Sequence, residues 1–449
     1  IPMIYLIFYL GMDVAYMRNT AAKEDDLREQ QRAFSMSFGA ILLVGGVVAA
    51  LGMIFAGPVG SLFRMRPETF RYMLAIVYSD ALIAVPYAHL RMRNRALRFA
   101  LLRLLFVAVN LGLNIGLIVY LHWGVTAIFF SNLVGNLLIA VLLLPEYFQL
   151  FRPALMRGGP WRALWKYALP IMPAMLAVSI VENGDLAVLN YLPDRIARSL
   201  YHLDSANAVL GVFNFNYKLG VAMLLVVQMF RMAWTPFSLQ HGESAGAPQL
   251  YSRVLTALML VCSVVFLGVS VLLPVVVHVP WVYHIVKEPS YWQGLPIVPV
   301  ILLAYMFAGM YSVVTAGLYI ERRTDILPWI AGSGAVLNVL ICIVASRHLG
   351  LVAVAWATPA SYIVMAAVGA WQSNRFYPVP FEWGRLVHLA AIVAAIFFAD
   401  EWITRGMPQT SGSTIALKVG LLLAFPVLLL ATRFFRAGEW KAIRRAVRV

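Results

Sequence analysis

Charge and cysteine are both scarce in this sequence. Asp, Glu, Lys and Arg make up 12% of its 449 residues, against about 25% in a soluble domain, while 62% of the residues are hydrophobic. Its two cysteines, Cys262 and Cys342, lie in long apolar runs, which argues against a disulfide framework or a metal site. The eight histidines show no His-x-x-x-His or His-x-x-Glu-His spacing, and there is no Walker-type glycine-rich loop. The composition excludes a soluble domain and gives no support to zinc- or ATP-dependent catalysis, so we do not expect an enzyme.

Long apolar runs fill most of the chain. A helix needs about 20 predominantly apolar residues to cross the hydrocarbon core of a bilayer. Thirteen runs of about that length are candidate spans: 1–18, 33–56, 70–90, 97–121, 123–145, 163–192, 207–233, 254–280, 292–320, 325–346, 350–372, 384–403 and 414–434. The short gaps between them leave no room for a folded soluble domain, so the sequence predicts a multi-pass helical membrane protein.

The net charge of +15 is divided unevenly between alternate loops. One side carries Arg18, Lys23, Arg28, Arg32, Arg91, Arg93, Arg95, Arg98, Arg152, Arg157, Arg162, Lys166, Arg231, Arg253, Arg322, Arg323, Arg375, Arg385 and the tail from Arg433 to Arg448. The other side carries only Arg64, Arg66, Arg71, Arg195, Arg198, Lys287, Arg347, Arg405 and, at a span edge, Lys418. The positive-inside rule therefore predicts a cytoplasmic C-terminus. We expect the basic tail to bind lipid headgroups, not nucleic acid.

The ends of the chain add an expectation about helix number. Thirteen spans with a cytoplasmic C-terminus place Ile1 outside, and the sequence starts within an apolar run, without Met and without signal-peptide features. We therefore expect one further helix before Ile1 and fourteen spans in the native protein.

Two segments of the chain repeat the same plan. Residues 93–132 and 321–361 each have a basic start, a helix with a mid-span Asn, a short turn with Gly, and a returning helix. The helices before them, at 75–93 and 303–323, correspond as well. The displacement is six helices, an even number, so the two halves have the same orientation in the membrane. Parallel repeats of this kind form two lobes with a substrate path between them.

The fold class predicted from this repeat is an all-α polytopic protein with two pseudo-symmetric six-helix lobes and two additional C-terminal helices. The predicted parts are 1–145 (N-terminal lobe without its first helix), 146–162 (cytoplasmic interlobe linker), 163–375 (C-terminal lobe) and 376–449 (two extra helices and the basic cytoplasmic tail).

Ionisable residues lie inside the sixth and seventh predicted spans. The sixth holds Pro170, Pro173, Glu182 and Asp185, and the seventh holds Lys218. A charged side chain at membrane depth costs about 2.5–3.5 kcal/mol on insertion scales, so it normally faces a partner or a water-filled cavity. Opposite charges on adjacent spans are typical of a transporter interior.

Two interpretations of these residues stay open. Lys218 binds an anionic substrate, directly or after its carboxylate partner takes up a proton or cation; alternatively it forms a permanent ion pair that fixes two helices. Pro170 and Pro173 remove helical hydrogen-bond donors and kink the span. We predict a hinge for alternating access there, with a static kink as the alternative.

Other polar residues within the spans suggest weaker sites. Asp80 and Arg103 could pair across the first lobe and line a cavity, or pack and snorkel. Asp13 and Arg231 are placed near cytoplasmic ends, where a structural role is expected. The mid-span residues Asn110, Asn114 and Asn338 are expected to form interhelical hydrogen bonds.

Three motifs resemble a known family. They are "ALPIMPAMLAVSIVENGDLAVLNYL", "GVFNFNYKLGVAMLLVVQMFRMAWTPF" and "YWQGLPIVPVILLAYMFAGMYSVVTAGLYIERRT". The whole chain resembles the polysaccharide-transporter branch of the multidrug/oligosaccharidyl-lipid/polysaccharide (MOP) exporter superfamily, especially bacterial O-antigen and capsule repeat-unit flippases (Wzx type). Asp185 is followed by Leu186 where relatives often have Arg.

The resemblance implies a MATE-like fold, a location in the bacterial inner membrane, and transport of a polyprenyl-pyrophosphate-linked oligosaccharide by alternating access for lipopolysaccharide, capsule or exopolysaccharide assembly. Membrane lipids, and the polymerase and glycosyltransferases of the same pathway, are the partners it implies. No cofactor is expected, and coupling to H⁺ or Na⁺ is left open.

Other functions stay open from the sequence. A cation-coupled small-molecule (drug-type) antiporter would have the same two lobes. A membrane glycan polymerase or transferase would need larger outer loops than "PDRIARSLYHLDSAN". Relatives that export teichoic-type polymers, peptidoglycan precursor or free polysaccharide complete the alternatives.

Overall fold

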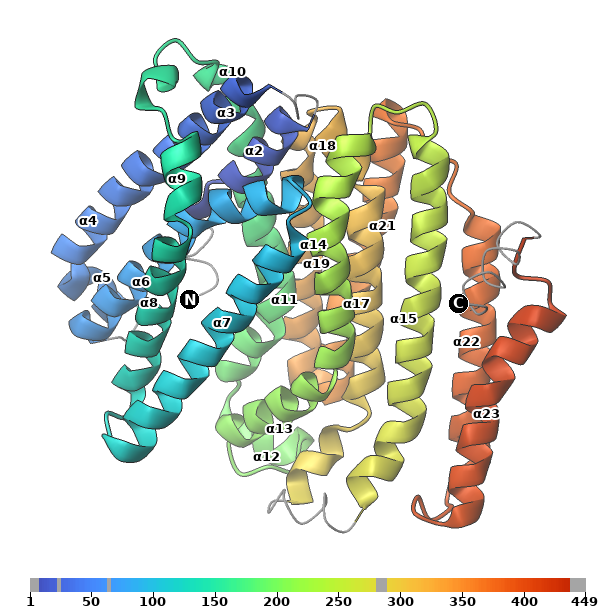
Figure 1. Ribbon diagram of the computed structural model, residues 1–449. Coiled ribbons are helices and arrows are strands. Elements are labelled where there is room, and N and C mark those ends of the chain that lie inside the picture. The colour runs from blue at the N-terminus through green and yellow to red at the C-terminus, as the bar shows by residue number, and fades with distance from the viewer. Residues whose placement is uncertain (1–7, 22–25, 63–65, 280–288, 437–449) are drawn as a thin grey trace. The chain divides into compact units, whose positions relative to one another are not determined.

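The computed structural model describes residues 8–21, 26–62, 66–279 and 289–436. Every regular element in these residues is a helix, and they contain no strand (Figure 1). The residues of the basic tail after Arg436, together with Lys23, Arg64 and Lys287, lie outside the described residues.

The helices follow the predicted spans closely. The α-helices are α2 (Met12–Thr20), α3 (Leu27–Ala40), α4 (Gly46–Ile54), α5 (Ala56–Leu62), α6 (Pro67–Met92), α7 (Ala96–Ile115), α8 (Val125–Leu142), α9 (Leu144–Leu150), α10 (Trp161–Ala168), α11 (Ile171–Asn190), α12 (Asp194–Leu200), α13 (Ala206–Leu219), α14 (Val221–His241), α15 (Ala247–His278), α17 (Ile297–Val314), α18 (Ala316–Ile320), α19 (Leu327–His348), α20 (Leu351–Ala355), α21 (Ala357–Phe376), α22 (Trp383–Ile403) and α23 (Gly412–Ala431). Short π or 3₁₀ segments are η1 (Ile41–Gly45), η2 (Gly116–Tyr120), η3 (Pro153–Met156), η4 (Pro289–Gly294) and η5 (Thr324–Ile326).

Twelve helices within the described residues are long and apolar enough to cross a membrane. They correspond in order to twelve of the thirteen predicted spans, which confirms a multi-pass membrane protein. The remaining span, 1–18, lies partly outside the described residues and is represented by α2. The helix expected before Ile1 stays a prediction.

The predicted span at 207–233 is divided in the structure. Residues 207–233 were predicted to form one helix, but the structure has α13 and α14 with a break at Gly220. A Cβ atom added at Gly220 would lie 2.7 Å from the Ile301 side chain of α17. The break thus falls where the backbone passes close to α17, a position at which a larger residue would clash with Ile301.

The chain divides into two compact units. Unit 1 comprises 1–179, 232–243 and 316–332, and unit 2 comprises 180–231, 244–315 and 333–449. The divisions fall inside α11, α14 and α19 and between α17 and α18, so these helices contribute residues to both units. The lobe boundaries derived from the repeat stay a prediction.

Unit 1 is built around α6, which packs against α8, α2 and α4. An apolar cluster joins α6, α7 and α8; its buried members are Ile83, Tyr87, Leu90, Leu102, Ile139 and Leu143. A Cβ atom at Gly135 of α8 would lie 2.9 Å from the Phe106 ring of α7, so a small residue there permits close helix packing.

The span containing α3 and α4 widens in its middle. Residues Ile41–Gly45 form a π-helical turn, η1, in which backbone hydrogen bonding is displaced. The hydroxyl of Tyr78 on α6 donates a hydrogen bond of 3.1 Å to the carbonyl of Leu42 in this turn. A tyrosine from the neighbouring helix therefore supplies a donor where the helix is irregular, as apolar surroundings require.

Unit 2 centres on α17, which packs against α21, α15 and α13. The pairing of α17 with α21 matches that of α6 with α8 in unit 1, and these pairs are the equivalent helices of the predicted repeat. The packing therefore agrees with a parallel repeat. Helix α22 packs against α15, and α23 packs against both α22 and α15.

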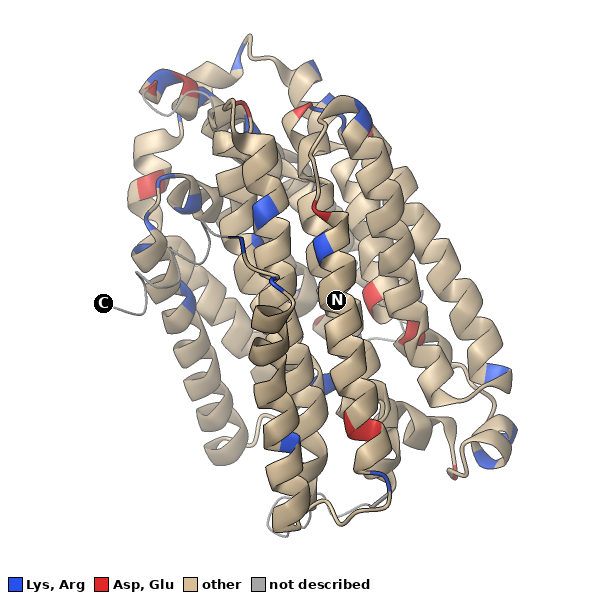
Figure 2. Cartoon of the chain, turned by 90° about the vertical axis from the view of Figure 1, so that its right-hand side faces the viewer, with Lys and Arg blue, Asp and Glu red and all other residues tan. Residues whose placement is uncertain are grey.

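Charged residues are sparse along most helices; Figure 2 shows long stretches of ribbon with neither blue nor red. One exception is a buried ion pair between the last two helices. Lys418 of α23 lies 3.0 and 2.9 Å from the two carboxylate oxygens of Asp400 on α22, and the two residues are 1% and 4% exposed. From the sequence Lys418 is expected at a span edge, and its pairing with Asp400 is not predicted.

The mid-span asparagines behave in two ways. Asn338 of α19 donates a 3.4 Å hydrogen bond to the Val181 carbonyl of α11, which confirms the predicted interhelical bond. The prediction is wrong for Asn110 and Asn114, which hydrogen bond to each other at 2.8 Å along α7. Their spacing of four residues places them on the same helix face, so Asn114 Nδ2 can donate to Asn110 Oδ1. Asn110 Nδ2 and Asn114 Oδ1 form no hydrogen bond within the described residues.

The two prolines of the sixth predicted span occupy different positions. Pro170 lies in the turn between α10 and α11, and Pro173 lies in the first turn of α11. Proline is tolerated in a first turn because the amide hydrogen it removes has no helical acceptor. The predicted kink is therefore a break at Pro170, and its role as a hinge stays a prediction.

Candidate functional site

Glu182 lies at the centre of a polar cluster in unit 2. Tyr362 of α21, which is completely buried, donates a 3.0 Å hydrogen bond to Glu182 Oε1 on α11. Tyr217 of α13 donates to the Glu182 backbone carbonyl at 3.2 Å, and Tyr305 of α17 donates to the Tyr217 hydroxyl at 2.8 Å. Side chains from α13, α17 and α21 therefore converge on one carboxylate-bearing turn of α11.

The order of donors in this cluster is fixed by chemistry. A tyrosine hydroxyl has one hydrogen to donate and can also accept. Tyr217 uses its hydrogen for the Glu182 carbonyl and accepts from Tyr305. The rings of Tyr217 and Tyr305 meet edge to face at 6.1 Å, so packing supports the same arrangement.

Asp185 lies one turn further along α11 and has a different environment. It is 0% exposed, and its Oδ1 accepts from the Leu186 amide at 2.8 Å. Its Oδ2 is buried and accepts no hydrogen bond from the residues that the structure describes. The buried Thr358 hydroxyl of α21 lies beside this carboxyl group and interacts with it, although the contact falls outside good hydrogen-bond geometry.

Close helix packing brings α11 and α19 together at Asp185. A Cβ atom at Gly184 would lie 2.6 Å from Oδ1 of Asn338. Asn338 is itself 0% exposed and accepts from the Cys342 thiol at 3.8 Å. Glycine at 184 therefore lets the amide of Asn338 approach the backbone of α11 next to Asp185.

The side chains around Asp185 limit what this residue could bind. The described residues contain no group of three or more His, Cys, Asp or Glu side chains that could hold a metal ion. A single carboxylate with hydroxyl and amide oxygens nearby suits a proton or a hard monovalent cation better than a transition metal. A bare charge at this buried position would carry a large desolvation cost.

Lys218 does not pair with either carboxylate. It is exposed, near the end of α13, and it forms no ion pair or hydrogen bond with any described residue. The alternative in which Lys218 permanently fixes two helices through Glu182 or Asp185 is therefore wrong for this structure. The lysine remains available to a substrate, and its binding role stays a prediction.

Arg231 lies deeper in its helix than the sequence predicts. The predicted span ends at 233, which places Arg231 near a cytoplasmic helix end. The helix α14 continues to His241, so Arg231 lies well inside it. Its Nη2 donates to the Ala308 carbonyl of α17 at 2.9 Å, and the guanidinium interacts electrostatically with Tyr305 and Tyr362. Arg231 therefore belongs to the surroundings of the Glu182 cluster.

The two candidate residues of unit 1 do not form the predicted pair. The Arg103 guanidinium of α7 lies over the rings of Tyr87 and Phe99, at 4.7 and 5.9 Å from their centroids. It forms no ion pair with Asp80 of α6, both residues being among those described. Arg103 thus follows the packing alternative, with cation–π contacts in place of a carboxylate. A cavity role for Asp80 stays a prediction.

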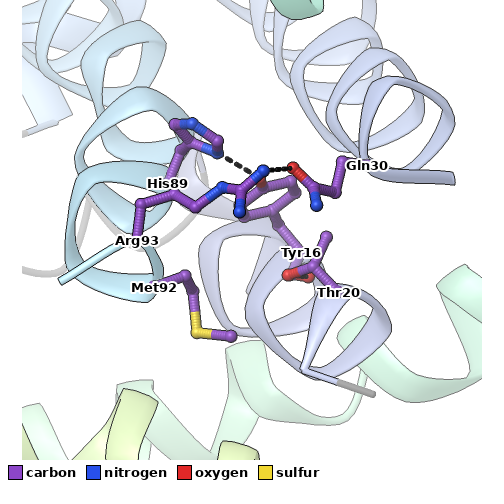
Figure 3. A pocket seen from close by; sticks show the side chains of 6 residues that line it. All are labelled: Tyr16, Thr20, Gln30, His89, Met92 and Arg93. Atoms are coloured by element: carbon purple, nitrogen blue, oxygen red, sulfur yellow. Dashed lines mark hydrogen bonds between the residues drawn. The ribbon is translucent and has the colours of Figure 1, made fainter. Parts of the chain in front are cut away.

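Unit 1 also has a small polar pocket, drawn in Figure 3. The buried Tyr16 hydroxyl and His89 Nδ1 lie 2.7 Å apart, and Arg93 donates to Gln30 Oε1 at 2.8 Å. Thr20 and Met92 complete the lining. The cavity volume is about 10 Å³, about the space of one water molecule, so an oligosaccharide would not fit there.

Comparison with solved structures identifies the fold. A crystal structure of a MATE protein in complex with MaL6 is similar over 83% of this chain and 85% of its own length, with a TM-score of 0.61 and 14% identity. An outward-facing multidrug resistance MATE family transporter of the MOP superfamily gives a TM-score of 0.58 at 16% identity, covering 83% of this chain and 84% of the other.

A third similar structure is a MOP superfamily transporter from Pyrococcus furiosus, described as having a binding pocket of reverse polarity. Its TM-score is 0.57 and its identity 16%, with 83% of this chain and 84% of the other covered. No protein-family model matches the chain, and no curated protein matches it in sequence. The likeness confirms the predicted fold class, an all-helical, two-lobe, MATE-like membrane protein.

Proposed function

We propose that this protein transports lipid-linked oligosaccharide repeat units across the bacterial inner membrane by alternating access. Such a cargo has an apolar tail, an anionic pyrophosphate and a polar glycan. Moving it through hydrocarbon requires a hydrated path with positive charge and groups that contact sugars. The proposal accounts for a lysine, an arginine and several tyrosines on the transmembrane helices of one unit.

The observation that carries the proposal is the state of Lys218. It is exposed on a helix of an apolar bundle and has no partner among the described residues. A lysine without a partner is unfavourable in such surroundings, so an unpaired one indicates a binding or transport role. A pyrophosphate would supply the missing counter-charge. The family resemblance of the segments around Glu182 and Lys218 supports the same cargo.

Asp185 supplies a reason for coupling to a cation gradient. Its buried, unpartnered Oδ2 needs a proton or a bound cation when the site is closed to water. Thr358 and Asn338 are the described residues whose oxygens could join it around a monovalent cation. We therefore propose H⁺ or Na⁺ coupling at Asp185, while Glu182 keeps its hydrogen bond to Tyr362.

The orientation and partners follow from the same proposal. The basic loops and the C-terminus would face the cytoplasm, where glycosyltransferases build the cargo, and a polymerase would receive it on the other side. Membrane lipids would surround the apolar helix faces. No nucleic acid is expected to bind.

The proposal is tested by deleting the gene and measuring lipid-linked oligosaccharide on the cytoplasmic leaflet. Accumulation that is cleared by the wild-type gene and not by Lys218→Ala supports the cargo and the role of the lysine. Equal clearance by both removes Lys218 from the mechanism. No accumulation at all contradicts the cargo.

A cation-coupled drug-type antiporter is the second candidate. It is favoured by the acidic and aromatic character of the Glu182 cluster, which would suit an organic cation. The similar MATE structure described as a multidrug resistance transporter supports it too. This alternative predicts a change in drug resistance on deletion, with no change in surface glycan.

A further inference from the structure

One end of unit 1 contains two hydrogen bonds that close helix C-termini. The last four carbonyls of a helix have no partner within the helix, and a basic or amide side chain from elsewhere can satisfy them. Ile320 is the last residue of α18, and Met92 is the last residue of α6. Both carbonyls accept hydrogen bonds from side chains far away in the sequence.

Arg18 closes the end of α18. Its Nε and Nη2 donate to the Ile320 carbonyl at 3.1 and 2.8 Å, and the same Nη2 lies 3.0 Å from Glu243 Oε1. Arg18 is only 8% exposed, whereas the Glu243 side chain is 64% exposed. A guanidinium at a helix C-terminus also interacts favourably with the helix dipole, so the carbonyl is the main partner.

Gln240 closes the end of α6. Its Nε2 donates to the Met92 carbonyl at 2.8 Å. Gln240 is in the last turn of α14, and Arg18 is in the last turn of α2. In the predicted repeat, α2 corresponds to α14, and α6 corresponds to the helix that ends with α18. Each repeat therefore contributes one donor helix and one acceptor helix, and the two bonds are equivalent under the repeat.

From this reciprocal arrangement we infer that Arg18 and Gln240 form a latch, which holds the basic helix ends of the two repeats together in this state. The inference rests on the proposed alternating access, since a transporter that opens toward the basic side must separate these ends. Both bonds cross from one repeat to the other, so opening breaks them together. Neither side chain needs to contact the cargo.

The latch is tested with the full chain in inside-out membrane vesicles, without cargo. The reporter is Met92→Cys, a pocket-lining position that is 4% exposed, in a background with Cys262→Ala and Cys342→Ser. A membrane-impermeant maleimide measures how often the basic end opens. We expect Arg18→Ala and Gln240→Ala each to raise the labelling rate about tenfold, the effect of losing one hydrogen bond to a charged or buried group.

Arg28→Ala is the matched control. Arg28 is an exposed basic residue in the same unit, and its side chain forms no hydrogen bond or ion pair with a described residue. Arg18→Lys keeps the charge near Glu243 but cannot donate from two nitrogens to Ile320, so it should also raise labelling. This second variant serves if Arg18→Ala does not fold.

Labelling rates in the Arg18 and Gln240 variants equal to those of Arg28→Ala would overturn the latch. Such a result together with cargo accumulation on gene deletion would leave the proposed function intact. Faster labelling without any cargo accumulation would keep the latch and reject the cargo.

Discussion

Two buried aspartates in unit 2 differ in whether the carboxylate has a basic partner. Asp400 is 4% exposed and has a lysine, Lys418, within 3.0 Å of both carboxylate oxygens. Asp185 is 0% exposed, and its Oδ2 accepts no hydrogen bond within the described part of the chain. An aspartate paired with a lysine fixes two helices in one arrangement. A buried carboxylate without a counter-charge instead needs a proton or a cation that can come and go. The comparison separates a structural charge from a candidate coupling site.

Position in the fold agrees with this division. Asp400 and Lys418 lie on α22 and α23, the helices predicted to lie outside the repeat. Asp185 lies on α11 beside Asn338 and Thr358, which belong to helices of the repeat. The fully paired buried aspartate is thus found in the added helices, and the aspartate without a fixed counter-charge is found where alternating access is proposed.

The largest expected effect comes from breaking the paired site. Lys418→Ala leaves Asp400 as an isolated buried charge, which should lower the free energy of unfolding by about 3–5 kcal/mol. Unfolding of the purified protein in detergent measures this. Replacing both residues, Asp400→Leu with Lys418→Met, should restore most of the loss, because the pair as a whole contributes little net stability. A double variant as unstable as Lys418→Ala would contradict this account.

A smaller loss is expected at the packing contact beside Asp185. Gly184→Ala would place a methyl group 2.6 Å from Asn338 Oδ1 and force α11 and α19 apart. The expected loss of unfolding free energy is about 1–3 kcal/mol. Gly420→Ala on α23, where an added Cβ meets no atom within 4 Å, is the control and should raise the unfolding free energy by about 0.5–1 kcal/mol, because alanine favours a helix more than glycine does.

The Glu182 cluster should show a loss of about 1 kcal/mol for one hydrogen bond. Tyr362→Phe removes the donor to Glu182 Oε1 and leaves the ring packing in place. Tyr120→Phe, at a ring that is 78% exposed, is the matched control. Equal unfolding free energies for the two variants would show that the Tyr362 bond adds no stability.

The smallest effects on stability are expected at Asp185 and Lys218. Lys218→Ala removes an exposed side chain and should change the unfolding free energy by no more than about 0.5 kcal/mol. Asp185→Asn removes a buried charge that has no fixed counter-charge, so it should not lower the unfolding free energy. Transport should be affected instead: Asp185→Asn should abolish its dependence on a cation gradient. A large stability loss in Asp185→Asn would place Asp185 with Asp400 as a structural residue.

Much of the fold was predictable because apolar run length determines where membrane helices form. Twelve of the thirteen predicted spans recur as apolar helices. The bounds of the span predicted at 207–233 were wrong because hydropathy does not register a break at Gly220, where the backbone lies close to Ile301. The same error hid Arg231, whose depth depends on where α14 ends.

The site was predictable only in part. Mid-span charge identified Glu182, Asp185 and Lys218, but pairing depends on helix rotation, which apolar composition does not determine. Lys218 is exposed, while Lys418, placed at a span edge from sequence, is buried against Asp400. Tyr362 carries no charge, so it does not stand out as a site residue in the sequence. Its hydroxyl within an apolar run was the only indication of a polar role.

The most direct test is transport by the purified protein in liposomes that contain a polyprenyl-pyrophosphate-linked oligosaccharide. Appearance of the glycan on the opposite leaflet is measured with wild type and Lys218→Ala, with and without a H⁺ or Na⁺ gradient. We predict gradient-dependent transport by wild type and a transport rate at least about tenfold lower in Lys218→Ala. The reason is that one hydrogen bond to a charged group contributes about that factor. No transport of this cargo by well-folded wild-type protein, together with transport of an organic cation, would contradict the account.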